Sequence, residues 1–539
     1  MIIVHPTSDT ILRPPRILAL ALLLGIFPSI VAAEDHDVGA AERLLPMPVK
    51  IEAGVGGFRI DAGTVLVAPA AWQEEATTLA ADLRALTGLP FPVRESSDGP
   101  AIRLAIDTEP ARQSPEGYRL RVGSDGVEIT AAAAAGVFYG GRTLMQLLPP
   151  AAGKDALVIA AVAIEDHPRF AWRGLMLDCS RTLQSVDYLK ATLNRMAVFK
   201  LNVLHLHLTD DQGWRIEIKK HPELTRKGAL FSASFKEPPS HEGFYTQEQL
   251  KGVLAYAATR HITVVPEIEM PGHSHEVMVS RPDLTCAGRT SPEVFPFYKG
   301  PTTTSDVFCA GNEDVFRFLE DVLDEVTAVF PSTFIHVGGD EVPKTAWKSC
   351  PKCQARMKAE GLENEHALQS YFIRRIEKVL SAKGRRLVGW DEILEGGLAP
   401  NATVMSWRGV SGGIAAAKAG HDVVMSPTSH CYFDYDYAAI NSQRVFSFDP
   451  LAGLEPQAAR RVLGVQANFW SHIDREPELV DRQLFPRLMA LAERGWSPDN
   501  RADWPGFSIR ARAQLPRLER MGVHFQTSDL PTSRKSNQP

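Results

Sequence analysis

Short apolar runs alternate with helical segments over the last two thirds of this chain, and this alternation limits the possible folds more than any other feature. Parallel strands joined by helices produce such a pattern, and eight repeats over roughly 330 residues match the size of a (β/α)8 barrel. An open doubly wound sheet is the alternative, but no glycine-rich phosphate loop follows the first run. We therefore predict an α/β fold with a barrel at residues 166–505. Its strands are expected at Leu175–Leu177, Val203–Leu208, Ile262–Val265, Phe334–Val337, Leu387–Trp390, Val404–Trp407, Val423–Met425 and Leu463–Gln466.

The sequence on either side of the barrel has a different character. Residues 34–165 contain short alternating strands, such as 118–122 and 126–130, and two alanine-rich helical stretches, which predict a small α+β domain. Residues 506–539 are expected to form one helix followed by a disordered polar tail that begins at Ser528.

The first 33 residues have the pattern of a signal peptide. Arg13 and Arg16 precede an apolar run, which ends in small residues just before Glu34. This run of about 15 residues is short for a membrane span, which needs roughly 20. We therefore expect an exported protein, periplasmic or secreted, without a stable membrane anchor.

Composition excludes some partners and leaves the cysteines to be explained. A net charge of −6 and the absence of a basic stripe argue against nucleic acid as a partner. The pair Cys350 and Cys353 could be half of a zinc site, but no two further ligands of matching spacing follow it. Because an exported chain permits disulfides, we expect bridges Cys350–Cys353 and Cys286–Cys309. The remaining cysteines, Cys179 and Cys431, are expected to be buried free thiols.

The segment Phe334 to Glu341 (FIHVGGDE) is the strongest sign of chemistry. A buried strand ends at two glycines, which permit a sharp turn and a close approach of ligand. Two adjacent carboxylates, Asp340 and Glu341, follow at the strand's carboxyl end, where barrels of this type place their active sites.

Acidic and aromatic residues follow the other predicted strands as well. The carboxyl ends of all barrel strands meet at one mouth, so these side chains should converge there. Carboxylates would bind sugar hydroxyls while aromatic faces stack on the sugar ring, so the pattern predicts a carbohydrate site. The residues concerned are Asp178, Arg181, Asp210, Asp211, Glu267, Glu269, His273, Trp390, Asp391, Glu392, Trp407, Arg408, Tyr432, Asp434 and Trp470.

Two histidines offer a competing interpretation. His205 and His207 lie on one face of a strand, as in metal-dependent barrel hydrolases. His273 is available as a third ligand, but the further ligands of such a site are not evident. We expect the pair to fill the barrel interior, and we expect neither a metal nor an organic cofactor.

Four separated motifs resemble glycoside hydrolase family 20, the β-N-acetylhexosaminidases. They occur in the family's order and are DHPRFAWRGLMLD (166–178), LNVLHLHLTDDQGWR (201–215), PEIEMPGH (266–273) and HVGGDE (336–341). The resemblance covers the barrel, and residues 34–165 look like the domain that precedes it in that family. It implies an exo-acting retaining enzyme that removes terminal β-linked GlcNAc or GalNAc from chitooligosaccharides or glycans.

The resemblance also implies a role for each residue of the site. Glu341 would protonate the leaving oxygen, and Asp340 would hold the substrate's 2-acetamido group while its carbonyl attacks the anomeric carbon. Adjacent side chains on extended backbone diverge, which suits such a division better than two carboxylates facing one bond. Asp210 and His273 would orient the acid, and Arg181, Tyr432 and Asp434 would bind the sugar. Trp390, Trp407 and Trp470 would surround the acetamido methyl group.

Three positions depart from the family's pattern and leave the substrate open. His472 stands where a glutamate usually contacts the 4- and 6-hydroxyls of the terminal sugar, Thr182 replaces a common histidine, and Glu269 replaces an aspartate. Alternatives are release of a disaccharide or a modified hexosamine, or a catalytically silent glycan-binding protein. The sequence does not determine the oligomeric state.

Overall fold

The computed structural model describes residue 39 and residues 43–107, 114–148, 157–286, 291–300, 304–472 and 475–531. The predicted signal peptide lies outside these residues. Within them, no helix is both long enough and apolar enough to cross a membrane.

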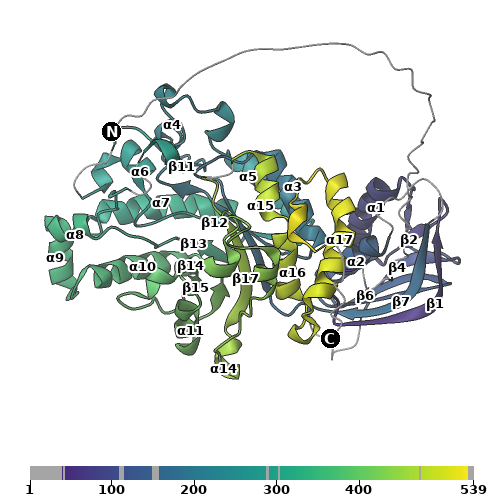
Figure 1. Ribbon diagram of the computed structural model, residues 1–539. Helices are drawn as coiled ribbons and strands as arrows, with labels where there is room; N and C mark the ends of the chain where they lie inside the picture. The colour runs from purple at the N-terminus through teal and green to yellow at the C-terminus, as the bar shows by residue number, and fades with distance from the viewer. Residues whose placement is uncertain are drawn as a thin grey trace, which may run out of the picture. The chain divides into compact units, whose positions relative to one another are not determined.

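The N-terminal domain is a seven-stranded mixed sheet with order β1-β7-β5-β6-β4-β2-β3. Its two helices, α1 (Gln73–Thr87) and α2 (Ala134–Leu147), lie on the same side of the sheet (Figure 1). Apolar side chains alternate along the strands, and one face is buried against these helices. The strands are β1 (Lys50–Ile60), β2 (Val65–Val67), β3 (Val93–Arg94), β4 (Ala101–Ile106), β5 (Tyr118–Gly123), β6 (Gly126–Ala131) and β7 (Leu157–Asp166).

The predicted barrel is confirmed. Eight parallel strands close in the order β12-β13-β14-β15-β16-β17-β8-β9, each within a few residues of its expected position. The strands are β8 (Trp172–Asp178), β9 (Val203–His207), β12 (Thr263–Glu267), β13 (Phe334–His336), β14 (Arg386–Trp390), β15 (Thr403–Ser406), β16 (Val423–Met425) and β17 (Val462–Phe469). A short antiparallel pair, β10 (Thr209–Asp210) and β11 (Gly213–Trp214), extends from the mouth.

Helices follow most of the barrel strands (Figure 1). The longer ones are α3 (Val186–Val198), α5 (Gln247–Ala258), α7 (Glu313–Val329), α9 (Pro351–Glu360), α10 (Glu365–Ala382), α11 (Ser411–Lys418), α15 (Pro477–Leu484) and α16 (Arg487–Trp496). Shorter ones are α4 (Glu223–Gly228), α6 (His275–Ser280), α8 (Thr345–Ser349), α12 (Thr428–Cys431), α13 (Ser442–Phe446) and α14 (Pro456–Ala459). Only a short 3-10 helix, Asp391–Leu394, connects β14 to β15.

The C-terminal segment differs from the prediction where the structure describes it. The helix α17 (Trp504–Arg520) is present, and residues 528–531, the first four of the predicted disordered tail, are folded against the protein. A 3-10 turn forms at Thr527–Asp529, and Leu530 is buried because its apolar side chain packs into the core. Residues 532–539 lie outside the described part.

The predicted disulfides are not formed in the structure, in which all six cysteines are free. The prediction paired cysteines that are near each other in the sequence. The fold instead brings Cys350 and Cys353 next to Cys286 and Cys309, so that the four form one group. Cys179 and Cys431 are buried free thiols, as expected.

Candidate active site

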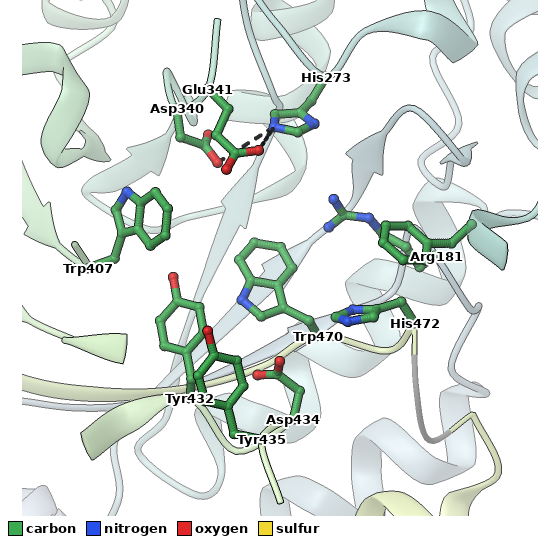
Figure 2. Close-up of a pocket in the computed structure, with 11 residues that line it drawn as sticks. Arg181, His273, Asp340, Glu341, Trp407, Tyr432, Asp434, Tyr435, Trp470 and His472 are labelled. Atoms are coloured by element: carbon green, nitrogen blue, oxygen red, sulfur yellow. Dashed lines mark ion pairs between the residues drawn. The ribbon is translucent and has the colours of Figure 1, made fainter. Parts of the chain in front are cut away.

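A pocket of about 270 Å³ opens at the carboxyl ends of the barrel strands. In Figure 2 the acid pair and His273 lie on one side of it, and aromatic rings face them from the other side. Nine residues predicted from the sequence line this pocket together with two that were not predicted, Phe297 and Tyr435. The predicted ones are Arg181, His273, Asp340, Glu341, Trp407, Tyr432, Asp434, Trp470 and His472.

The turn after β13 separates the two adjacent acids. Gly338 and Gly339 have φ angles of 67° and 93°, which glycine adopts without strain, and Glu341 has a φ of 46°. The backbone N–H of Gly339 donates to Oε1 of Glu269 over 2.9 Å. The Asp340 side chain is 14% exposed and that of Glu341 49% exposed, so one acid faces the protein and the other faces the opening.

Glu269 fixes this turn, a role that the sequence did not reveal. A Cβ atom on Gly338 would lie only 1.8 Å from Oε1 of Glu269, so the glycine is required by the glutamate beneath it. Burial, together with the nearby charge of Asp340, raises the pKa of Glu269 well above its usual range. The position of Glu269 in the PEIEMPGH motif could have indicated its contact with this turn, since Glu269 follows β12, the strand that pairs with β13.

His273 connects the acid pair to a deeper carboxylate. Its Nδ1 lies 3.2 Å from Oδ1 of Asp210, and its Nε2 lies 3.7 Å from both Oδ2 of Asp340 and Oε2 of Glu341. Burial would lower the pKa of His273, but Asp210 and Asp340 raise it well above 6.5. A cationic imidazole therefore lies between three carboxylates, as the predicted pairing of Asp210 and His273 requires.

Arg181 is held rigidly at the pocket wall. Its Nη2 lies 2.7 Å from Oδ2 of Asp210, its Nε donates to Gln212 over 2.9 Å, and its guanidinium lies over the Trp470 ring. Burial would raise the pKa of Asp210, but the charges of Arg181 and His273 hold it far below its usual range. Asp210 itself lies beneath the pocket and does not line it.

Asp340 has an unmet hydrogen-bonding capacity. Its Oδ1 is buried and has no hydrogen-bond partner among the described residues. Burial raises the pKa of Asp340, and the cation at His273 opposes that rise. A buried carboxylate oxygen without a donor is costly, so a ligand N–H placed here would be bound strongly.

Aromatic rings form the opposite wall. Trp407 and Tyr432 are stacked, with ring centres 6.1 Å apart and planes at 24°, and Trp470 lies 6.3 Å from Tyr432. Burial and the nearby carboxylate of Asp340 raise the pKa of Tyr432 well above 10, so its hydroxyl remains a donor. Trp390 was also expected in this wall, but it is 1% exposed and does not line the pocket. Its Nε1 donates to Glu267 over 2.8 Å, which draws the ring into the barrel interior.

The outer edge of the pocket contains Asp434, His472 and Phe297. Oδ1 of Asp434 is buried without a partner in the described structure, and burial raises its pKa to about 7. The ring of His472 packs against Phe297 with centres 4.7 Å apart. Burial and the charge of Arg181 lower the pKa of His472, so a neutral imidazole stands where the family usually has a carboxylate.

The inner histidines belong to a buried network below the pocket. His205 and His207 are buried in the barrel, as expected, and His207 contacts Glu267 directly. His336 Nδ1 lies 2.8 Å from Oε1 of the same glutamate. Within the described barrel, sets of possible metal ligands occur around Glu267 and Asp210, and their members already serve one another as partners in ion pairs.

An acid pair opposite stacked aromatic rings, at the mouth of a (β/α)8 barrel, defines a glycoside hydrolase. Residues 170–499 match the family described as "Glycosyl hydrolase family 20, catalytic domain", and residues 41–167 match "Glycosyl hydrolase family 20, domain 2". The chain belongs to glycoside hydrolase family 20.

Known proteins show the same relationship. A "Beta-hexosaminidase" of Porphyromonas gingivalis is 42% identical over 520 residues, which are 92% of this chain and 65% of that protein. A "Beta-N-acetylhexosaminidase" of Cellulomonas fimi is 34% identical, and the match covers 90% of this chain and 96% of the Cellulomonas protein. The solved structure of an exo β-N-acetylglucosaminidase from Vibrio harveyi, in complex with N-acetylglucosamine, has a TM-score of 0.81 at 30% identity. That match covers 90% of this chain and 78% of the Vibrio chain.

Proposed function

We propose that this protein is an exo-acting, retaining β-N-acetylhexosaminidase that removes terminal β-linked GlcNAc or GalNAc by substrate-assisted catalysis. The observation that supports this most directly is the buried, unpartnered Oδ1 of Asp340, next to the half-exposed Glu341. A 2-acetamido group supplies the N–H donor that Asp340 lacks. The names of the relatives above are consistent with such a substrate.

Binding would orient the sugar between the two walls. The Arg181 guanidinium, fixed by Asp210, would donate to ring hydroxyls, and Asp434 would accept from another. The acetamido methyl would contact Trp407 and Trp470, and the Tyr432 hydroxyl would donate to the acetamido oxygen.

The reaction would then proceed in two displacements. The acetamido oxygen attacks the anomeric carbon, the bond to the leaving oxygen breaks, and Glu341 gives that oxygen its proton. Asp340 stabilises the positive charge that develops on the amide nitrogen of the oxazoline-like intermediate. Glu341, now ionised, removes a proton from water, whose oxygen attacks the anomeric carbon. The bond between that carbon and the acetamido oxygen breaks, which opens the oxazoline-like ring and restores the acetamido group. Two inversions at one carbon give net retention.

Paired variants and paired leaving groups test this proposal. Glu341→Gln should be slow on natural glycosides but much less affected on aryl glycosides with activated leaving groups, which need no proton. Asp340→Asn should reduce kcat by about 10²–10³-fold for both, as loss of one preorganised electrostatic contact does elsewhere. A β-glucoside, which lacks the amide, should be a very poor substrate, and equal rates on the glucoside and the GlcNAc glycoside would exclude the mechanism.

Specificity at the outer hydroxyls depends on His472 in this proposal. A neutral imidazole beside Phe297 donates or accepts a single hydrogen bond, so it discriminates less between epimers at C4 than a carboxylate would. We expect wild type to hydrolyse GlcNAc and GalNAc aryl glycosides at similar rates and His472→Glu to widen the ratio. An unchanged ratio would assign the selection to another residue.

Export is part of the proposal. The arginines, apolar run and small residues before Glu34 support cleavage by a signal peptidase. Cell fractionation followed by N-terminal sequencing should find a mature chain that begins at Glu34 outside the cytoplasm. A cytoplasmic chain that retains the leader would refute it.

A further inference from the structure

Four cysteines outside the active site converge from two separate segments of the chain. Cys286 and Cys309 lie before α7, and Cys350 and Cys353 lie at the start of α9. All four sulfurs lie within 4.8 Å of one another, and three of the cysteines are buried. None of these thiols has a role in the proposed hydrolysis.

Three of the distances between the sulfurs are close to those expected around a tetrahedral metal ion. Cys309 Sγ lies 3.7 Å from the sulfurs of both Cys350 and Cys353, and Cys286 Sγ lies 3.5 Å from that of Cys353. Four thiolates bound to zinc at about 2.3 Å have sulfurs separated by about 3.8 Å. Two disulfides would instead give two distances of about 2.05 Å and longer distances between the pairs. None of the three distances is that of a disulfide bond, and all four cysteines are free in the structure.

The backbone holds both halves of the cluster close together. The N–H of Cys309 donates to the carbonyl of Leu284 over 2.9 Å, which places Cys309 beside Cys286. A Cβ atom on Gly311 would lie 2.2 Å from the Lys352 carbonyl oxygen, so the loop before α7 touches the start of α9 at this glycine. This close approach brings the sulfurs of all four cysteines near enough to bind a single metal ion.

The surroundings also favour negative charge on the sulfurs. Cys350 is the N-cap of the ten-residue helix α9, and Cys353 lies in its first turn. The helix N-terminus carries partial positive charge, which stabilises thiolates there. The C-x2-C spacing is the usual one for half of a structural zinc site, and the other half precedes it in this chain.

We propose that Cys286, Cys309, Cys350 and Cys353 bind one structural zinc ion. The four thiols lose their protons on binding, and no position remains open for water or substrate. The site would fasten the loop between α6 and α7 to the segment that follows the acid pair. That loop also carries Phe297 of the pocket and Thr304, whose hydroxyl donates to Asp211 over 3.0 Å.

Metal analysis of the full chain, purified without added metal or chelator, tests this proposal. We expect about one zinc ion per chain, released together with four thiols by a mercurial reagent. Cys353→Ser should lower the zinc content by about tenfold or more, whereas Cys431→Ser, at a buried thiol outside the cluster, should retain it. The zinc-free protein should also unfold at a lower temperature.

Cobalt substitution of wild type provides a test that does not require a variant to fold. Cobalt in the site should give the charge-transfer and d–d absorption of tetrahedral thiolate ligation. Two disulfides in the intact mass, iron in place of zinc, four free thiols without metal, or zinc retained by Cys353→Ser would each overturn the proposal. None of these outcomes depends on the substrate, so failure here is separate from failure of the proposed hydrolysis.

Discussion

Asp434 allows a quantitative prediction about the relation between the site and stability. Burial raises its pKa from an ordinary 3.8 to about 7, and its Oδ1 has no donor in the described structure. The folded protein therefore holds a proton at Asp434 that the unfolded chain has already lost between pH 4 and 7. Folding stability must fall as pH rises through this window and level off above it.

The magnitude follows from the shift. At roughly 1.36 kcal/mol per pKa unit, Asp434 destabilises the folded state by up to about 4 kcal/mol at pH 8 relative to pH 4. Asparagine does not titrate, so any fixed cost of Asp434→Asn is the same at every pH. The stability of the variant relative to wild type should therefore increase by about 4 kcal/mol across this range, within a factor of two.

Urea unfolding of both proteins, measured at half-unit steps from pH 4 to pH 8, would provide the two curves. Parallel curves would refute the reasoning, because they would show that Asp434 titrates alike in the folded and unfolded chains. A sugar hydroxyl that donates to the ionised carboxylate should also lower its pKa. Affinity for GlcNAc should thus rise with pH through 7 in wild type but not in Asp434→Asn.

Three further predictions concern the groups around the acid pair. Tyr432→Phe should keep the ring packing but lose a hydrogen bond to developing charge, so kcat should fall about 10–100-fold with little change in melting temperature; a normal kcat would contradict the role of the hydroxyl. Gly338→Ala should destabilise the protein by more than 1–2 kcal/mol in thermal unfolding, since its Cβ would strike Glu269 at a φ of 67°. The matched control Gly252→Ala, inside α5 with open space around it, should be neutral or stabilising by about 0.5–1 kcal/mol, and equal losses would contradict the steric argument. Asp210→Asn should lower the pKa of His273 from its raised value, which imidazole NMR titration would detect; an unchanged pKa would mean that other carboxylates raise it.

The barrel and most of its mouth could be predicted from sequence because both follow from periodicity. Each apolar run predicted one strand. In a closed barrel, the residues that follow the strands all lie at the same mouth of the barrel. This logic located Asp340, His273 and Arg181 in one pocket. It failed for Trp390, because position at a strand end does not determine whether a ring turns inward or outward. A buried hydrogen bond to Glu267 decides that.

Loops were predictable only where a motif constrained them. Phe297 and Tyr435 reach the pocket from long connections whose path has no periodic signal. The cysteine pairs were inferred from separation along the chain, whereas the contact that joins them depends on the packing of two separate segments at Gly311. Residues 528–539 looked polar overall, but the apolar side chain of Leu530 packs into the core and holds residues 528–531 there.

The left-handed backbone at the acid pair affects how this protein would respond to selection for heat tolerance. Glu341 has a φ of 46° and His273 a φ of 43°, a region that costs side-chain-bearing residues about 1–2 kcal/mol each. Glycine or asparagine at either position would relieve that strain. At His273 this gain is outweighed, because its removal would leave the buried carboxylate of Asp210 without this cation. A library screened for thermal resistance alone should therefore accumulate replacements at the half-exposed Glu341, and those variants would lack the proposed acid.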